Sequence, residues 1–133
     1  MLQVTYISTA RSMYPTSTEI REILASCRKN NVRNGLSGLL IVAGRRFLQV
    51  LEGPALACEA TYDRIKTDPR HFALVELGRK KIEQPSFPQW AMGFEEPGSH
   101  DLLQQVELLT GKLEDPYLRE HLLSFAQLHL RAA

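Results

Sequence analysis

Two apolar segments near the middle of the chain, residues 36–43 and 46–52, are separated only by Gly44 and Arg45. Each segment is short and rich in Leu, Ile, Val and Phe, which is typical of buried β-strands. Because the connection is so short, the two strands must pair as an antiparallel hairpin. The sequence therefore predicts a fold built around a central hairpin.

Helical patterns lie on both sides of this hairpin. Before it, Thr16 to Glu19 has the sequence of a capping box and predicts a helix over about residues 17–29. Asn30-Asn31 is expected to end that helix. After the hairpin, Gly53-Pro54 ends the second strand, and Pro favours the start of a helix, expected over residues 55–66.

Three further segments, residues 2–8, 72–83 and 90–95, are interpreted as strands. The order of elements is then strand, helix, strand, strand, helix, strand, strand. Two helices that cross one face of a mixed sheet form the ferredoxin-like arrangement. We therefore predict an α+β fold with a ferredoxin-like sheet.

The end of the chain has a different character. Leucines at helical spacing predict two short amphipathic helices, the second starting at Asp115-Pro116. Their apolar stripes would cover either the other face of the sheet or an oligomer interface. We expect residues 1–96 to form the main domain and residues 97–133 to form a helical extension packed on its sheet.

Composition excludes several classes of function. The 133 residues are 44% hydrophobic and carry a net charge of +1, which fits one ordinary domain and gives no sign of a nucleic-acid or membrane partner. The N-terminus lacks the basic start and apolar stretch of a signal peptide. Neither Cys27 and Cys58 nor the four histidines have metal-ligand spacing. We expect a cytoplasmic protein without a metal site.

One polar residue is out of place in the hairpin. Gln49 lies in the second strand between apolar neighbours, and both faces of that strand are apolar. Gln49 should therefore be buried, and an unpaired buried amide costs about 1–3 kcal/mol. From this stretch alone, a core glutamine bonded to backbone or to another polar group is the favoured interpretation. Tyr6, in the first strand, would likewise be ordinary core packing.

A set of motifs favours a different interpretation of Tyr6 and Gln49. In chain order they are VTYIS at 4–8, CRKNN at 27–31, GLSGLL at 35–40, RRFLQVLEGP at 45–54, TYDRI at 61–65, DPRH at 68–71 and FPQWAMGF at 87–94. LEGP alone is a weak signal, whereas the ordered set is specific. Over about residues 1–96 the chain resembles the BLUF domain, the flavin-binding sensor of blue light.

The resemblance implies a photoactive pair and a flavin site. Tyr6 matches the tyrosine that gives an electron and a proton to excited flavin, and Gln49 matches the glutamine between that tyrosine and the flavin. Asn31 matches the asparagine that bonds the carbonyl edge of the ring. The resemblance implies FAD or FMN as cofactor, and these further cofactor contacts: Asn30, Ile23, Ile65, Arg64, Asp68, Arg70 and His71.

The resemblance also implies a signalling role. Trp90 and Met92 match strand residues that report the switch outward. No output enzyme is recognised in the sequence, so the expected function is a non-enzymatic photoreceptor that acts on a separate effector protein and forms a homo-oligomer. The alternatives are a flavin-free ferredoxin-like interaction module, which would have lost Tyr6, Asn31 or Gln49, and a small flavin reductase, which would need a nicotinamide site.

Overall fold

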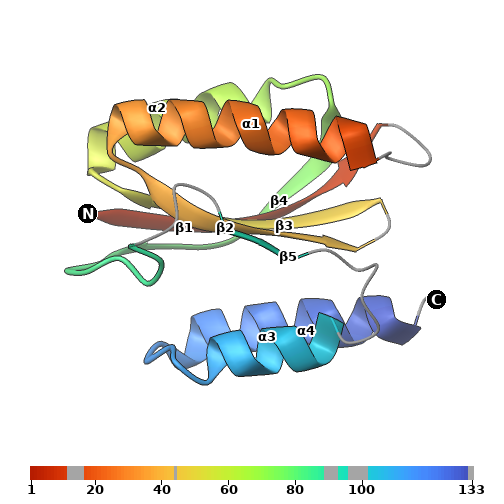
Figure 1. Ribbon diagram of the computed structural model, residues 1–133. Helices are drawn as coiled ribbons and strands as arrows, with labels where there is room; N and C mark the ends of the chain where they lie inside the picture. The colour runs from red at the N-terminus through yellow and green to blue at the C-terminus, as the bar shows by residue number, and fades with distance from the viewer. Residues whose placement is uncertain (12–16, 44, 89–92, 96–101, 132–133) are drawn as a thin grey trace.

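The computed structural model describes residues 1–11, 17–43, 45–88, 93–95 and 102–131. It has three layers (Figure 1): two helices, a central sheet, and a second pair of helices on the opposite face. The elements are β1 (Leu2–Ala10), α1 (Ser17–Asn34), β2 (Ser37–Ala43), β3 (Arg46–Gly53), α2 (Ala55–Lys66), β4 (His71–Lys81), β5 (Gly93–Glu95), α3 (Leu102–Thr110) and α4 (Pro116–Arg131).

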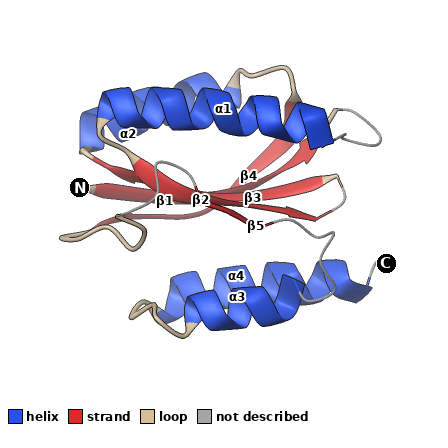
Figure 2. Cartoon of the chain, viewed as in Figure 1, coloured by secondary structure: helices blue, strands red, loops and turns tan. Residues whose placement is uncertain are grey.

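The sheet has the predicted ferredoxin-like order. Its strands are arranged β4-β1-β3-β2-β5, and Figure 2 shows them in red as one layer between the two helix layers. The pairs β1–β3, β1–β4 and β2–β3 are antiparallel, and the short β5 pairs in parallel with β2. The predicted hairpin of β2 and β3 therefore exists, and β3 lies at the centre of the sheet.

The predicted end of the first helix was wrong. Helix α1 continues through Asn30 and Asn31 to Asn34. The residue that ends it is Gly35, whose φ of 69° lies in the left-handed region favoured by glycine. The Leu36 amide then donates to the Asn31 carbonyl at 2.8 Å, which closes the end of the helix.

Strand ends also differ from the predictions. Strand β1 continues to Ala10, two residues beyond the predicted end, because both neighbouring strands still pair there with residue 9. Strand β4 spans residues 71–81 rather than 72–83. The predicted capping residue Thr16, the turn residue Gly44, and Trp90 and Met92 all lie outside the described residues.

The alternation of side chains along β3 divides the core into two clusters. Phe47 and Leu51 belong to the cluster beneath α1 and α2, together with Tyr6. Leu48 and Val50 belong to the opposite cluster. That second cluster also contains residues of both C-terminal helices: Val106, Leu118, Leu122, Phe125 and Ala126. Two positions were predicted for these helices, and the structure confirms the first: they cover the face of the sheet opposite α1 and α2.

Strands β2 and β3 approach each other closely at Gly38. A Cβ atom at this position would lie 2.0 Å from the carbonyl oxygen of Val50. Glycine is therefore required at this point, and the backbone of β3 is tightly confined between its neighbours.

Candidate functional site

A cavity of about 180 Å³ lies between the sheet and helices α1 and α2, and it is partly open to solvent. Strand β3 contributes Gln49 to its wall. The residues predicted to contact a cofactor all line this cavity: Asn30, Asn31, Ile23, Ile65, Arg64, Asp68, Arg70 and His71. The fold therefore brings together side chains from helices α1 and α2, strand β3 and the loop before β4.

Helix periodicity explains how α1 contributes to the cavity. Ile23, Cys27 and Asn31 are spaced four residues apart, so they share one face of the helix. That face packs toward the sheet, and Asn31 is only 2% exposed. The extra helical turn beyond Lys29 is what places the Asn31 side chain at the cavity.

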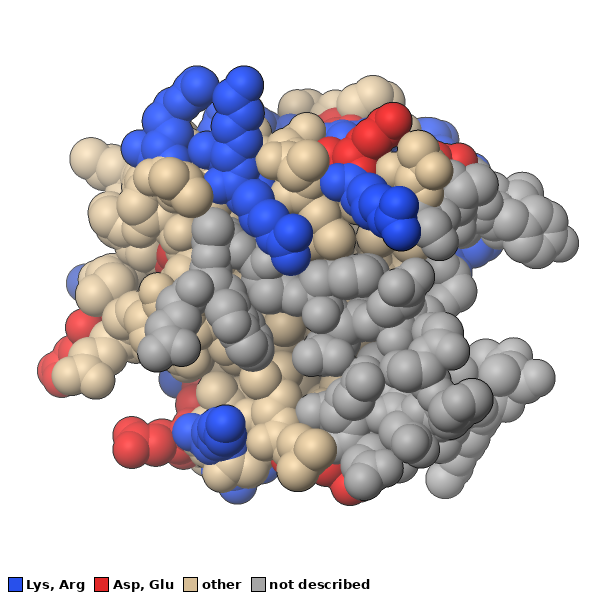
Figure 3. Space-filling view, in the orientation of Figure 1, with Lys and Arg blue, Asp and Glu red and all other residues tan. Residues whose placement is uncertain are grey.

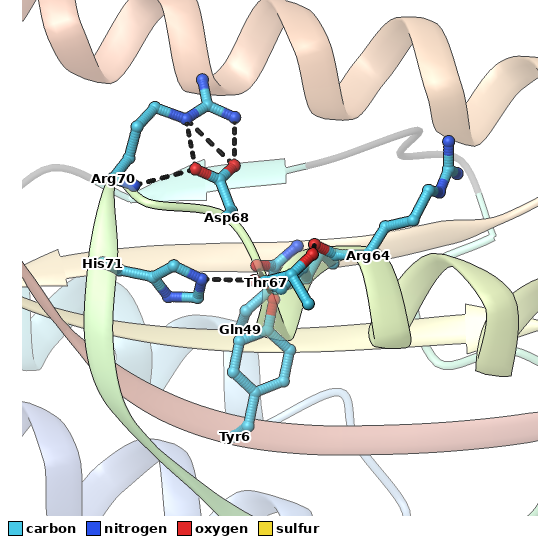
Figure 4. A network of polar contacts seen from close by, with 8 residues as sticks. Tyr6, Gln49, Arg64, Thr67, Asp68, Arg70 and His71 are labelled. Atoms are coloured by element: carbon cyan, nitrogen blue, oxygen red, sulfur yellow. Dashed lines mark hydrogen bonds and ion pairs between the residues drawn. The ribbon is translucent and has the colours of Figure 1, made fainter.

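Tyr6 and Gln49 form the polar centre of the site. They are paired residues on neighbouring strands, and the Tyr6 hydroxyl donates to Oε1 of Gln49. Figure 4 shows the phenol pointing from β1 toward the amide. Gln49 is 7% exposed, and its Nε2 is buried without a hydrogen-bond partner among the described residues. One end of the amide is therefore bonded, and the other end is left for a further partner.

Burial raises the pKa of Tyr6 well above its usual value, and the neighbouring Cys27 and Tyr62 side chains raise it further. The Tyr62 ring packs against Tyr6 with centroids 5.2 Å apart. Tyr6 is therefore a neutral phenol at physiological pH, with its proton held on the bond to Gln49.

Cys27 lines the cavity as well, although in the sequence it was considered only as a metal ligand, for which its spacing is wrong. Burial raises its pKa, and the Arg70 guanidinium opposes this rise. The residue is therefore a protonated thiol close to Gln49. Its position on the same helical face as Ile23 and Asn31 is the signal that could have identified it.

The loop after α2 holds an ion pair at the cavity wall. The Arg70 guanidinium bonds both carboxylate oxygens of Asp68, with contacts of 2.5 to 3.0 Å, and the Arg70 amide donates to the same carboxylate at 2.9 Å. The hydrogen bonds from Arg70 hold the pKa of Asp68 below its usual value. His71 lies next in the chain, with Nε2 2.6 Å from the Ile65 carbonyl oxygen. This arrangement fixes the loop against the end of α2.

Arg64 differs from Arg70 in its surroundings. Its guanidinium donates to Thr61 Oγ1 at 3.3 Å, and within the described part of the chain it forms no ion pair with a carboxylate. In Figure 4 it extends away from the Asp68–Arg70 pair. Lys and Arg side chains also gather over the same helix layer in Figure 3. Arg64 is thus a cationic group that an anionic part of a ligand could reach.

The cavity has further lining residues that sequence reasoning missed: Ser8, Ser26, Leu40, Phe47 and Thr61. Strand periodicity could have identified Ser8 and Phe47, because each lies two residues from Tyr6 or Gln49 on the same face. Among the described residues, the buried Ser8 hydroxyl also has no hydrogen-bond partner.

The lining residues fit a flat heteroaromatic ring. Ile23 and Ile65 are partly buried apolar walls on the two helices. Asn31 and Gln49 supply amides to the cavity wall, and Gln49 Nε2, which lacks a partner among the described residues, is a donor suited to a ring nitrogen or carbonyl. A buried unsatisfied donor is rare in native proteins, so it favours a ligand at this position.

Two other types of site are not seen in the described residues. No group of three or more His, Cys, Asp or Glu side chains is placed to hold a metal ion. No described helix is both long and apolar enough to cross a membrane.

Comparison with known proteins identifies the family of this chain. The family model "BLUF: Sensors of blue-light using FAD" matches residues 1–93. The chain is 36% identical over 59 residues to the blue light- and temperature-regulated antirepressor BluF of Escherichia coli (strain K12), covering 44% of this chain and 15% of that protein. It matches the dark state of BlrB, a BLUF protein, with 29% identity and a TM-score of 0.75 over 95% of both chains.

A second similar structure is BlrP1 of Klebsiella pneumoniae, solved with manganese and cyclic diGMP. It has 25% identity and a TM-score of 0.83 over 96% of this chain and 33% of that one. Another structure of BlrP1 contains FMN. This chain therefore spans a small part of the antirepressor and of BlrP1 but nearly all of BlrB. Because the family model matches residues 1–93 of 133, the chain belongs to the BLUF family of blue-light sensors that use FAD.

Proposed function

We propose that Tyr6 and Gln49 are the light-responsive pair of this BLUF domain, with FAD or FMN bound non-covalently in the cavity. The observation that carries the proposal is the buried Tyr6–Gln49 hydrogen bond, beside which the Gln49 Nε2 donor has no partner in the described part of the chain. The flavin supplies blue-light absorption and a ring that accepts an electron and a proton after excitation.

Tyr6 holds the proton that moves. Its hydroxyl proton lies on the bond to Gln49, and burial keeps the phenol neutral in the dark. Transient loss of an electron and this proton from Tyr6 would remove the donor that fixes Oε1 of Gln49. The amide could then rotate or change tautomer.

Gln49 is suited to such a change because an amide has a donor end and an acceptor end. In the new arrangement it would donate a new hydrogen bond to the C4 carbonyl of the ring and lower the absorption energy slightly. The apolar residues around it keep water away, so the two arrangements remain distinct. Return of the electron and proton to Tyr6 restores the dark arrangement without net reaction.

The remaining lining residues would bind and orient the cofactor. Asn31 bonds the carbonyl edge of the ring, with Asn30 beside it, and Ile23 and Ile65 cover its two faces. Arg64 and Asp68 contact the ring or the ribityl side. Arg70 and His71 shape the same wall, as their contacts with Asp68 and Ile65 support.

Output is proposed to leave through the segment of residues 90–92 and the C-terminal helices. Trp90 and Met92 would report the switch, and residues 97–133 would form an extension of the sensor domain at residues 1–96. The extension would contact a separate effector protein or a second copy of the chain. A cytoplasmic location is supported by Cys27 and Cys58, which are both free thiols.

The test is identification and reconstitution of the cofactor. Flavin released by heat from the purified protein should separate as FAD or FMN, at about one molecule per chain, and either should restore the yellow colour to the stripped protein. A colourless protein that neither flavin reconstitutes would contradict the proposal and would favour an interaction module.

A further inference from the structure

Glu52 is a fully buried carboxylate on strand β3, with 0% exposure. Its two oxygens accept four hydrogen bonds. Oε1 accepts from Ser37 Oγ at 3.2 Å and from the Phe87 amide at 2.6 Å. Oε2 accepts from Gln3 Nε2 at 3.1 Å and from the Ser86 amide at 2.9 Å. Since a carboxylate is an acceptor only, this set of donors matches its chemistry.

The four donors come from three parts of the fold. Gln3 and Ser37 are the register partners of Glu52 on β1 and β2. Ser86 and Phe87 lie in the connection between β4 and β5, 34 and 35 residues further along the chain. Because these two donors are backbone amides, the carboxylate fixes the path of the connection itself.

Packing alone does not account for a carboxylate here. Burying a charged group is costly, and apolar residues often replace buried polar groups with little loss of stability. An apolar side chain at position 52 could fill the space, but it could not hold two amides of a distant segment. The group is therefore suited to fixing position, which is the best-attested use of buried polar groups.

Glu52 is also placed close to the proposed switch. It follows Gln49 by three residues on the same strand, a separation of about 10 Å at the usual strand rise. Gln49 faces the cavity side, whereas residues 48, 50 and 52 face the other way. Strand β3 thus has the amide on one face and the carboxylate on the other.

The segment held by Glu52 leads to the opposite layer. Phe87 is 4% exposed and belongs to the same cluster as Leu118, Leu122 and Phe125 of α4. The connection then continues to β5, which pairs with β2 at Leu39 and Gly93. A shift of residues 86–87 would therefore reach the face that the C-terminal helices cover.

We propose that Glu52 is a positioning residue that couples strand β3 to the β4–β5 connection, so that a shift of β3 at Gln49 moves residues 86–87. This inference rests on the proposed function of Gln49. Four hydrogen bonds hold the Glu52 carboxylate, and β3 lies tightly against β2 at Gly38. A displacement of β3 is therefore transmitted through Glu52 to the β4–β5 connection.

The test is hydrogen–deuterium exchange of the peptide covering residues 82–95, in darkness and under blue light, in holoprotein. In the unmodified protein, light should change its exchange. In Glu52→Gln, an NH₂ group replaces one carboxylate oxygen, so a hydrogen-bond donor faces the donors that this oxygen accepted from. Exchange in darkness should rise about tenfold, as expected for loss of a hydrogen bond to a charged group. The light-dependent difference should disappear, while the flavin red shift remains.

A matched control is Glu114→Gln, which removes the same charge at an exposed position and should leave both readouts unchanged. If Glu52→Gln does not fold, Ser86→Pro removes one of the two amide donors and leaves the carboxylate intact. It should reduce the light-dependent difference.

The outcomes separate the inference from the function on which it rests. A full light-dependent difference in Glu52→Gln or Ser86→Pro would overturn the coupling. So would an unmodified protein that shows the red shift without any change in this peptide. An unmodified protein that binds flavin but shows no red shift would instead contradict the proposed function, and the coupling with it.

Discussion

Tyr6 and Gln49 lie directly opposite each other on β1 and β3, and the phenol hydroxyl donates to the amide oxygen. Sequence separation hides this relationship, because the two residues are 43 positions apart. The antiparallel register of two central strands creates it. The pair therefore depends on the sheet, and local loops contribute nothing to its geometry.

Removal of the Tyr6 hydroxyl should abolish the light response. Tyr6→Phe keeps the ring and its packing against Tyr62, so the protein should still bind flavin. It should show no red shift in the flavin band after blue light, because the transferable proton and the donor to Gln49 are gone. Absorption spectroscopy measures both properties.

The matched control for this change is Tyr62→Phe. Tyr62 is also buried and lies 5.2 Å from Tyr6 between ring centroids. In the described part of the chain no hydrogen bond joins Tyr62 to the Gln49 amide, and burial raises the pKa of Tyr62 to about 12. Tyr62→Phe should keep the red shift. A full red shift in Tyr6→Phe would show that another residue supplies the proton.

Neighbouring asparagines on α1 should differ in their effect on flavin affinity. Asn31 is 2% exposed, whereas Asn30 is half-buried, although both line the cavity. Asn31→Ala should raise the dissociation constant for flavin about 10- to 100-fold, since loss of a buried hydrogen bond costs about 1–3 kcal/mol. Asn30→Ala should have a smaller effect. Quenching of flavin fluorescence on titration measures both, and equal effects would contradict the assignment.

The Asp68–Arg70 ion pair should make stability depend on pH in the acid range. Arg70 lowers the pKa of Asp68 in the folded protein, so the pair stabilises the fold above the unfolded pKa of about 3.9. This stabilisation is lost as the pH falls through the folded pKa. Asp68→Asn should therefore lower the melting temperature at pH 7.

The difference between Asp68→Asn and the unmodified protein should shrink as the pH falls below about 4. Asp63→Asn is the control, because Asp63 forms a 3.4 Å pair with Lys66 but its side chain is 73% exposed. It should have little effect at any pH. A difference for Asp68→Asn that stays constant from neutral to acid pH would contradict this account.

Gly38 should tolerate no side chain. A Cβ atom would lie 2.0 Å from the Val50 carbonyl oxygen, so Gly38→Ala must push β2 and β3 apart. Overpacking of this kind costs about 1–3 kcal/mol or more. Gly111→Ala is the control, because the nearest atom to its Cβ would be the Glu107 carbonyl oxygen, at an ordinary contact distance of 3.5 Å. Urea denaturation should show a clear loss only for Gly38→Ala, and equal stability of the two variants would contradict the close approach.

The order of strands and helices could be predicted because it depends on local patterns. The two-residue connection at Gly44 and Arg45 required a hairpin, and Gly53-Pro54 marked the next helix. The end of α1 could not be predicted as well, because Asn30 and Asn31 are typical of a helix end. In the structure, α1 continues past Asn31, which is buried, and ends at Gly35, which has a left-handed backbone conformation.

The rest of the site depends on contacts between distant segments. Glu52 precedes Gly53-Pro54, where a charged residue is typical of a strand end at the surface. Its burial follows from amide donors 34 and 35 residues away, which no local pattern shows. Similarly, the leucine stripes of α3 and α4 predicted amphipathic helices but could not identify the surface that they cover.

The most direct measurement is the absorption spectrum of purified protein in darkness and after blue light, for the unmodified chain and for Gln49→Leu. The account predicts a flavin band that shifts slightly to the red and recovers in darkness. In Gln49→Leu, which keeps a side chain of similar size but loses both the donor and the acceptor of the amide, the flavin should bind without any shift. A flavin band that bleaches or does not respond in the unmodified protein, or an unchanged shift in Gln49→Leu, would contradict the Tyr6–Gln49 switch.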